Sequence, residues 1–138
     1  QNDIVNPQGF YSADEIDFQR VREVEEFNAT HLRSFRRKLY DAIRVEDLLD
    51  RDGRWIEACT DVALMYPLLD QCWSDEVEFI HTPIYRYRRK HSAGTVARFG
   101  RPYKIERLHY LKSKPSKPRL NARRPMDYAG AEPILRQG

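Results

Sequence analysis

The sequence predicts a mixed α/β fold in which helices pack on a small mixed sheet. Two patterns favour it: apolar residues recur at helical spacing over residues 61–72, and they alternate as in a strand over residues 77–80 and 84–87. A chain of 138 residues has room for one domain with a real hydrophobic core. We therefore expect a domain over residues 1–111, followed by a basic tail with prolines over residues 112–138.

The first part of the chain is expected to contain two helices and a turn. Ser12 opens a helix as the N-cap residue of a capping box, and this helix ends at Asn28. A basic amphipathic helix follows over residues 35–43, with a single helical turn over residues 46–49. The Asp-Arg-Asp-Gly composition of residues 50–53 predicts a turn there.

The helix over residues 61–72 is the most regular predicted element. Thr60 suits its N-cap position, and Asp61 falls in its first turn, where the helix dipole favours negative charge. Pro67 lies inside this helix and should kink it, because proline removes one backbone hydrogen bond.

Two cysteines flank this helix, thirteen positions apart. At helical rise that spacing is about 20 Å, so Cys59 and Cys72 should not pair with each other. They are interpreted as small buried residues of a reducing compartment, which predicts a cytoplasmic protein.

The last predicted elements are two strands and a short helix. Pro83 interrupts the alternation between residues 77–80 and 84–87, which argues for an edge strand or a bulge. A short helix is expected around residues 103–111. From Lys112 onward the Lys-Pro-Ser-Lys-Pro-Arg composition predicts an extended tail without fixed structure.

Charge is distributed unevenly along the chain. Residues 1–85 carry 9 Lys and Arg against 18 Asp and Glu, a net charge of −9, whereas residues 86–138 carry 15 against 3, a net charge of +12. The mean hydropathy is −0.77, and no apolar run approaches the roughly 18–20 residues of a membrane span. The asymmetry indicates that the second part contacts something anionic.

Asp61 is the first candidate for chemistry. A carboxylate in the first turn of a helix is held by backbone and can face a cleft, which suits a general base because a base needs fixed geometry. An ordinary helix start has the same pattern, so spacing alone does not separate the two interpretations.

The segment from His31 to Arg89 resembles the inverting glycosyltransferases of family 2, which have the GT-A fold. Three stretches carry the resemblance: His-Leu-Arg-Ser-Phe-Arg-Arg from residue 31, the Thr60-Asp61 pair at a helix start, and a late strand that ends in Tyr-x-Tyr at residue 87. Arg-Arg-Lys-His-Ser from residue 88 then approximates the Arg-x-His-x-x-Ser pattern that follows in the family, with the serine two places early.

The resemblance implies a role for each matching residue. Asp61 would be the catalytic base that takes the proton of an acceptor hydroxyl. Residues that would bind substrate are His31, Arg33, Trp55, Thr60, Arg88 and Arg89, and His91 would complete the shell of a metal ion. The family analogy also places a strand over residues 29–34.

The one Asp-x-Asp of this sequence, Asp50-Arg51-Asp52, falls in the predicted turn, and we do not take it as the Asp-x-Asp that holds the divalent metal in this family. We therefore expect the chain to be the C-terminal, acceptor-side half of a GT-A domain, inactive without the donor half. The implied cofactor is Mn²⁺ or Mg²⁺, held mainly by residues outside this chain. The implied partners are a nucleotide-sugar donor and a glycan, lipid-linked or other hydroxyl acceptor.

Other classes of function stay open. Cations alternate with aromatic residues between Arg86 and Arg124, as single-stranded nucleic acid binding requires, although no signature of a nucleic-acid-binding family accompanies them. Attraction of the basic part to an anionic membrane surface, at the inner face of a membrane, is a milder option. A pure interaction module is a third, for which the sequence gives no positive sign.

Overall fold

The computed structural model describes residues 21–23, 33–78, 80, 82 and 94–122. Its helices, in chain order, are α1 (Arg37–Tyr40), the 3-10 helix η2 (Val45–Leu48), α2 (Thr60–Asp70), the 3-10 helix η3 (Ser74–Glu76), α3 (Thr95–Phe99) and α4 (Arg101–Ser113). Within the described residues there is no sheet, and the single β-bridge joins Leu49 to Trp55. None of the described helices is long and apolar enough to cross a membrane.

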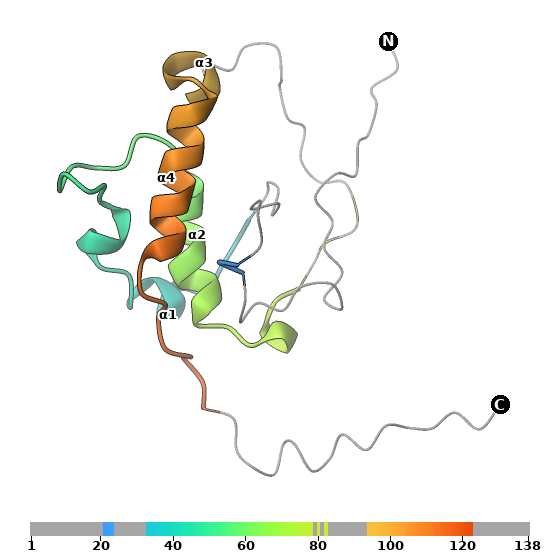
Figure 1. Cartoon of the computed structure of the whole chain (residues 1–138). Helices are drawn as coiled ribbons and strands as arrows, with labels where there is room; N and C mark the ends of the chain where they lie inside the picture. Colours follow the sequence, from blue (N-terminus) through green and yellow to red (C-terminus); the bar gives the residue numbers. More distant parts are fainter. Residues whose placement is uncertain (1–20, 24–32, 79, 81, 83–93, 123–138) are drawn as a thin grey trace.

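Helix α2 is the centre of the core. It lies beside α4 (Figure 1), and its inward face buries Val62, Ala63 and Tyr66 almost completely. The buried cluster around it is completed by Val21, Ile56, Cys59, Leu69 and Leu111. The helical periodicity that predicted α2 is thus explained by burial of one apolar face, which supplies most of the stability of a helix in a protein.

Helices α2 and α4 run in the same direction. The Cys59 thiol, at the start of α2, contacts the carbonyl oxygen of Lys104, in the first turns of α4, with a Sγ–O distance of 3.7 Å. At the other end, the Arg22 guanidinium contacts both Asp70, the last residue of α2, and the Leu111 carbonyl of α4. Both helix N-termini therefore lie at one end of the molecule (Figure 1).

The start of α2 differs from the prediction. The N-cap residue is Cys59, which has a left-handed φ of 59°, and its side chain makes no capping hydrogen bond. Thr60 is the first residue of the helix itself. Thr60 as N-cap is therefore wrong by one position. The physical reason is that the bend into the helix is made at Cys59, a residue type that seldom adopts this conformation.

The helix predicted over residues 35–43 is found only as the four residues of α1, none of which is buried. Without a buried face, packing does not extend it beyond one turn. The single turn expected over residues 46–49 is found as η2, one position earlier. The turn at residues 50–53 is confirmed: the Gly53 amide donates to the Asp50 carbonyl at 3.0 Å, and Gly53 has a φ of 71°, which glycine adopts without strain.

The helix expected around residues 103–111 is confirmed as α4, which is longer at both ends, and the short α3 precedes it. Gly100, with a φ of 85°, separates the two helices.

The predicted strands have little support. Val77, Glu78 and Ile80 are not in a strand, and neither is Ser34. Residues 84–87, most of residues 29–34 and most of the helix predicted from Ser12 to Asn28 lie outside the described residues, although Val21–Glu23 of that helix form a turn. The mixed sheet, and with it the α/β class, stays a prediction.

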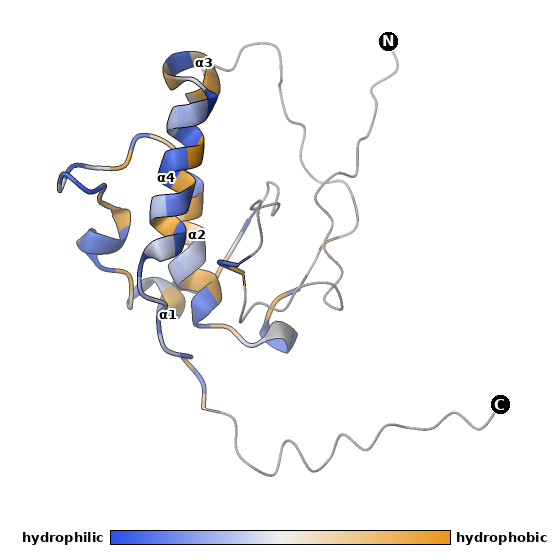
Figure 2. Cartoon of the chain, viewed as in Figure 1, coloured by the Kyte–Doolittle hydropathy of each residue, from blue (hydrophilic) through white to orange (hydrophobic). Residues whose placement is uncertain are grey.

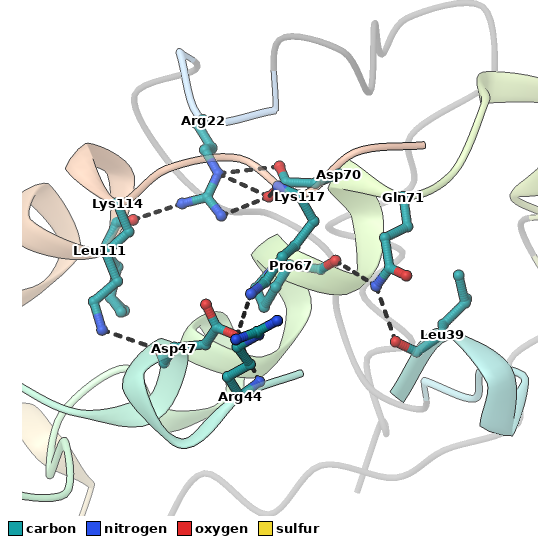
Figure 3. A network of polar contacts seen from close by, with 10 residues as sticks. All are labelled: Arg22, Leu39, Arg44, Asp47, Pro67, Asp70, Gln71, Leu111, Lys114 and Lys117. Atoms are coloured by element: carbon teal, nitrogen blue, oxygen red, sulfur yellow. Dashed lines mark hydrogen bonds and ion pairs between the residues drawn. The ribbon is translucent and has the colours of Figure 1, made fainter. Parts of the chain in front are cut away.

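Residues 114–122 are ordered against the rest of the protein, contrary to the expectation for the tail. The Lys114 ammonium donates to three carbonyl oxygens at the end of η2, those of Glu46, Asp47 and Leu49, at 2.6–3.1 Å. Figure 3 shows the contact with Asp47. Farther on, the Leu120 amide donates to the Gln71 carbonyl at 3.0 Å. This segment closes over the C-terminal end of α2, and the expected lack of structure is wrong for these residues.

Candidate functional site

The candidate base Asp61 lies in the first turn of α2, at the end of the molecule where α4 also begins. The backbone that leads into it is fixed, because Ala58 is fully buried and Cys59 is 7% exposed. The Asp61 side chain, in contrast, is 44% exposed. A carboxylate on an anchored backbone and open to solvent meets the geometric demand on a general base.

Arg33 approaches Asp61 from a segment 28 residues earlier in the chain. Its Nη1 donates to Asp61 Oδ2 at 3.0 Å, and the Arg33 side chain is only 15% exposed. The guanidinium therefore holds one carboxylate oxygen, and no contact is recorded for Oδ1 within the described part of the chain. The structure thus brings together two residues that the sequence had predicted for one site.

Further charge near this site comes from α4. Burial raises the pKa of the Cys59 thiol, the positive charge of Lys104 partly opposes that rise, and the negative charge of Asp61 adds to it. The Lys104 ammonium and the Asp61 carboxylate therefore both lie within electrostatic range of the residue at the start of α2.

Thr60 and Trp55 are both exposed, and the Trp55 side chain keeps 63% of its surface open. Trp55 is held in place by its backbone, through the bridge to Leu49. An exposed indole on an anchored loop can stack on a sugar face. The described contacts do not join Trp55 to Asp61, so its place in the same site stays a prediction.

The other predicted site residues, His31, Arg88, Arg89 and His91, lie outside the described residues. Within the described ranges there is no group of three or more His, Cys, Asp or Glu side chains that could hold a metal ion. The described structure therefore neither supports nor tests the metal role of His91.

A second polar cluster, which the sequence reasoning missed, lies at the opposite end of α2 (Figure 3). Arg22 donates to both Asp70 oxygens, with Nη2–Oδ2 at 2.6 Å, and the Lys117 amide donates to Oδ2 at 3.0 Å. Asp70 is buried at the C-terminus of α2, where the helix dipole disfavours a carboxylate. An acidic residue at this unfavourable position was the one sign of the cluster in the sequence.

This cluster borders a cavity of about 10 Å³, lined partly by Arg22, Tyr66 and Lys114. The cavity has room for about one water molecule and none for a sugar nucleotide. Since Arg22 and the Lys117 amide bind both oxygens of the Asp70 carboxylate, we assign the Asp70 cluster to stability, and Asp61 remains the candidate for chemistry.

Comparison with protein-family models, with curated proteins and with solved structures gives no match for this chain.

Proposed function

We propose that this chain is the acceptor-side part of an inverting, GT-A-type glycosyltransferase of family 2, with Asp61 as its general base. The observation that carries the proposal is the Arg33–Asp61 contact at 3.0 Å, which joins two of the stretches on which the resemblance rests. Both stretches would have to line one cleft for the proposed chemistry.

In the proposed reaction, Asp61 accepts the proton of an acceptor hydroxyl while that oxygen attacks the anomeric carbon of a nucleotide sugar. The bond from the anomeric carbon to the nucleoside diphosphate breaks on the opposite face, so the configuration inverts. A divalent cation, Mn²⁺ or Mg²⁺, held mainly outside this chain, would neutralise the leaving diphosphate.

Arg33 would act as a positioning residue in this reaction. By holding Oδ2 it fixes the carboxylate plane and leaves Oδ1 to take the proton. Accurate placement of a base relative to the acceptor oxygen supplies much of the rate, since small displacements of a catalytic group are costly.

The substrate-binding roles of His31, Trp55, Thr60, Arg88 and Arg89, and the metal role of His91, belong to the same proposal. We also propose a cytoplasmic location, at the inner face of a membrane.

The test measures nucleoside diphosphate release by the complete gene product that contains this chain, over a panel of sugar nucleotides and acceptors with Mn²⁺ or Mg²⁺. We expect release in the wild type and a loss of about a hundredfold or more in Asp61→Asn, with donor binding unchanged. Asp52→Asn, a change of an exposed acid in the turn before α2, is the matched control and should retain full activity.

Two results would overturn the proposal. If no donor of the panel releases nucleoside diphosphate, the proposed transferase activity is wrong. An Asp61→Asn variant as active as the wild type removes Asp61 from the chemistry and leaves its contact with Arg33 as a structural ion pair.

A further inference from the structure

The positive charge of the C-terminal part is used in two different ways. From Arg107 onward, three cations contact other parts of the protein. Arg107 pairs with Asp50 at 2.5 Å, Lys117 pairs with Asp47 at 2.7 Å, and Lys114 binds carbonyl oxygens. Arg119 lies over the ring of Trp73 and donates to the Cys72 carbonyl. The charge of these residues is therefore largely satisfied within the protein.

The cations at and before the N-terminal end of α4 are exposed to solvent. Arg98, Arg101 and Lys104 are all exposed, and no acidic partner is recorded for them among residues 21–23, 33–78 and 94–122. Arg98 rests on the ring of Phe99, a contact that leaves its charge unneutralised.

Helix stability does not explain these positions. Arg101 and Lys104 occupy the first turn of α4, which contains no acidic residue. The positive end of the helix dipole disfavours cations there, so both residues cost some helix stability. Their charges add to the positive end of the α4 dipole, which suits a contact with an anionic partner.

Exposed aliphatic side chains lie among these cations. Ile105 is 42% exposed and follows Arg101 by four residues, so the two share one face of α4. On the adjoining helix α3, Val96 is 48% exposed. Figure 2 shows hydrophilic and hydrophobic residues next to one another along α3 and α4.

The aromatic residues of this region are engaged with other side chains. Phe99 stacks on Tyr103 with ring centroids 4.8 Å apart, and Arg107 covers Tyr103 at 4.2 Å. Single-stranded nucleic acid needs open aromatic faces on which bases stack. A lipid surface instead needs cations for its phosphates and aliphatic side chains for the boundary of its acyl chains.

We propose that the α3–α4 surface, formed by Val96, Arg98, Arg101, Lys104 and Ile105, docks the protein on an anionic bilayer. The cations would lie against the lipid phosphates, and the two aliphatic side chains would enter the interface between headgroups and acyl chains. This inference does not depend on the glycosyltransferase proposal, because it needs neither Asp61 nor a sugar nucleotide.

The experiment is co-sedimentation of the 138-residue chain with vesicles. One set is phosphatidylcholine with about one third phosphatidylglycerol, the other is pure phosphatidylcholine, and both are measured at low and at high salt. We expect binding to the anionic vesicles only, falling as salt screens the charges.

The decisive variant is Arg101→Glu combined with Lys104→Glu. Each cation near an anionic surface contributes about fivefold to partitioning, so removal of two lowers binding about 25-fold, and reversal lowers it further. Acids in the first turn of a helix favour the dipole, so folding of α4 should not suffer.

Two controls complete the design. Lys38→Glu with Arg54→Glu makes the same change in net charge at exposed positions elsewhere and should bind more tightly than the α4 pair of reversals. Ile105→Ser should weaken binding several-fold, whereas Val45→Ser, at an exposed valine of η2, should leave it unchanged.

Three results would overturn the proposal. They are a wild-type chain that does not sediment with anionic vesicles, equal loss of binding in the two pairs of charge reversals, and tighter binding to a single-stranded oligonucleotide than to the vesicles at the same salt.

Discussion

Cys59 and Cys72 are both buried, and burial lowers the reactivity of their thiols. Burial raises the pKa of both thiols; at Cys72 the charge of Glu76 adds to the rise and Arg119 opposes it. Since the thiolate is the reactive form, both should react with Ellman's reagent far more slowly in the native chain than in denaturant. Equal rates in the two conditions would contradict this, and Cys72→Ala should leave one slow thiol.

The same shift gives a direction for stability against pH. In the unfolded chain the thiols have their ordinary pKa of about 9.0, while in the folded chain burial raises the pKa, so the thiols keep their protons to higher pH. The folded state then binds more protons, so the thiols' contribution to the free energy of unfolding falls as pH rises above about 9. Urea titrations across this range should show a smaller fall in Cys72→Ala than in the wild type.

At the scale of the element, α2 is fixed at its C-terminal end by a buried ion pair. The side chains of Arg22 and Asp70 are 11% and 5% exposed, and three donors converge on the Asp70 carboxylate from outside the helix. Asp70→Asn leaves the guanidinium without its counter-charge, which costs about 3–5 kcal/mol in buried pairs. Urea denaturation of this variant measures the loss, and a change below about 1 kcal/mol would contradict the assignment.

The elements that were predicted correctly are those whose pattern reflects burial of one face. Helix α2 has an apolar stripe that ends in the core, and the turn at Gly53 requires a positive φ that glycine supplies. The exact start of α2 was missed because it depends on the left-handed conformation of Cys59, and cysteine is not a residue type that signals this conformation. α1 was predicted too long because spacing alone does not show whether a face finds a partner.

For the whole molecule, contacts between distant segments were the least predictable feature. The Lys-Pro pairs from Lys114 onward have the composition of a linker, yet Lys114 and Lys117 bind η2 and α2, more than forty residues away. A local pattern cannot identify such partners. The proximity of Arg33 and Asp61 was expected only through the resemblance to a family, whereas the cluster around Asp70 had no comparable signal.

The acidic and basic parts of the chain form ion pairs with each other, and the strength of one such pair can be measured. Asp47 and Lys117 join the acidic and basic parts with side chains only 16–17% exposed. Asp47 also accepts from the Arg44 amide at 2.7 Å, so a single variant would mix two effects. A double-mutant cycle of Asp47→Asn and Lys117→Met isolates the pair, because contacts made by only one partner cancel.

We expect a coupling free energy of about 1–2 kcal/mol for this pair, since its partial burial limits screening by solvent and salt. Arg37 and Asp41 provide the matched control: they are four residues apart, their side chains are 88% and 61% exposed, and their coupling should not exceed about 0.5 kcal/mol. Urea denaturation of the four proteins of each cycle gives both values. Equal couplings would mean that the Asp47–Lys117 pair attracts only through solvent-screened charge, and that residues 114–122 are held by their other contacts, those of the backbone, Lys114 and Arg119.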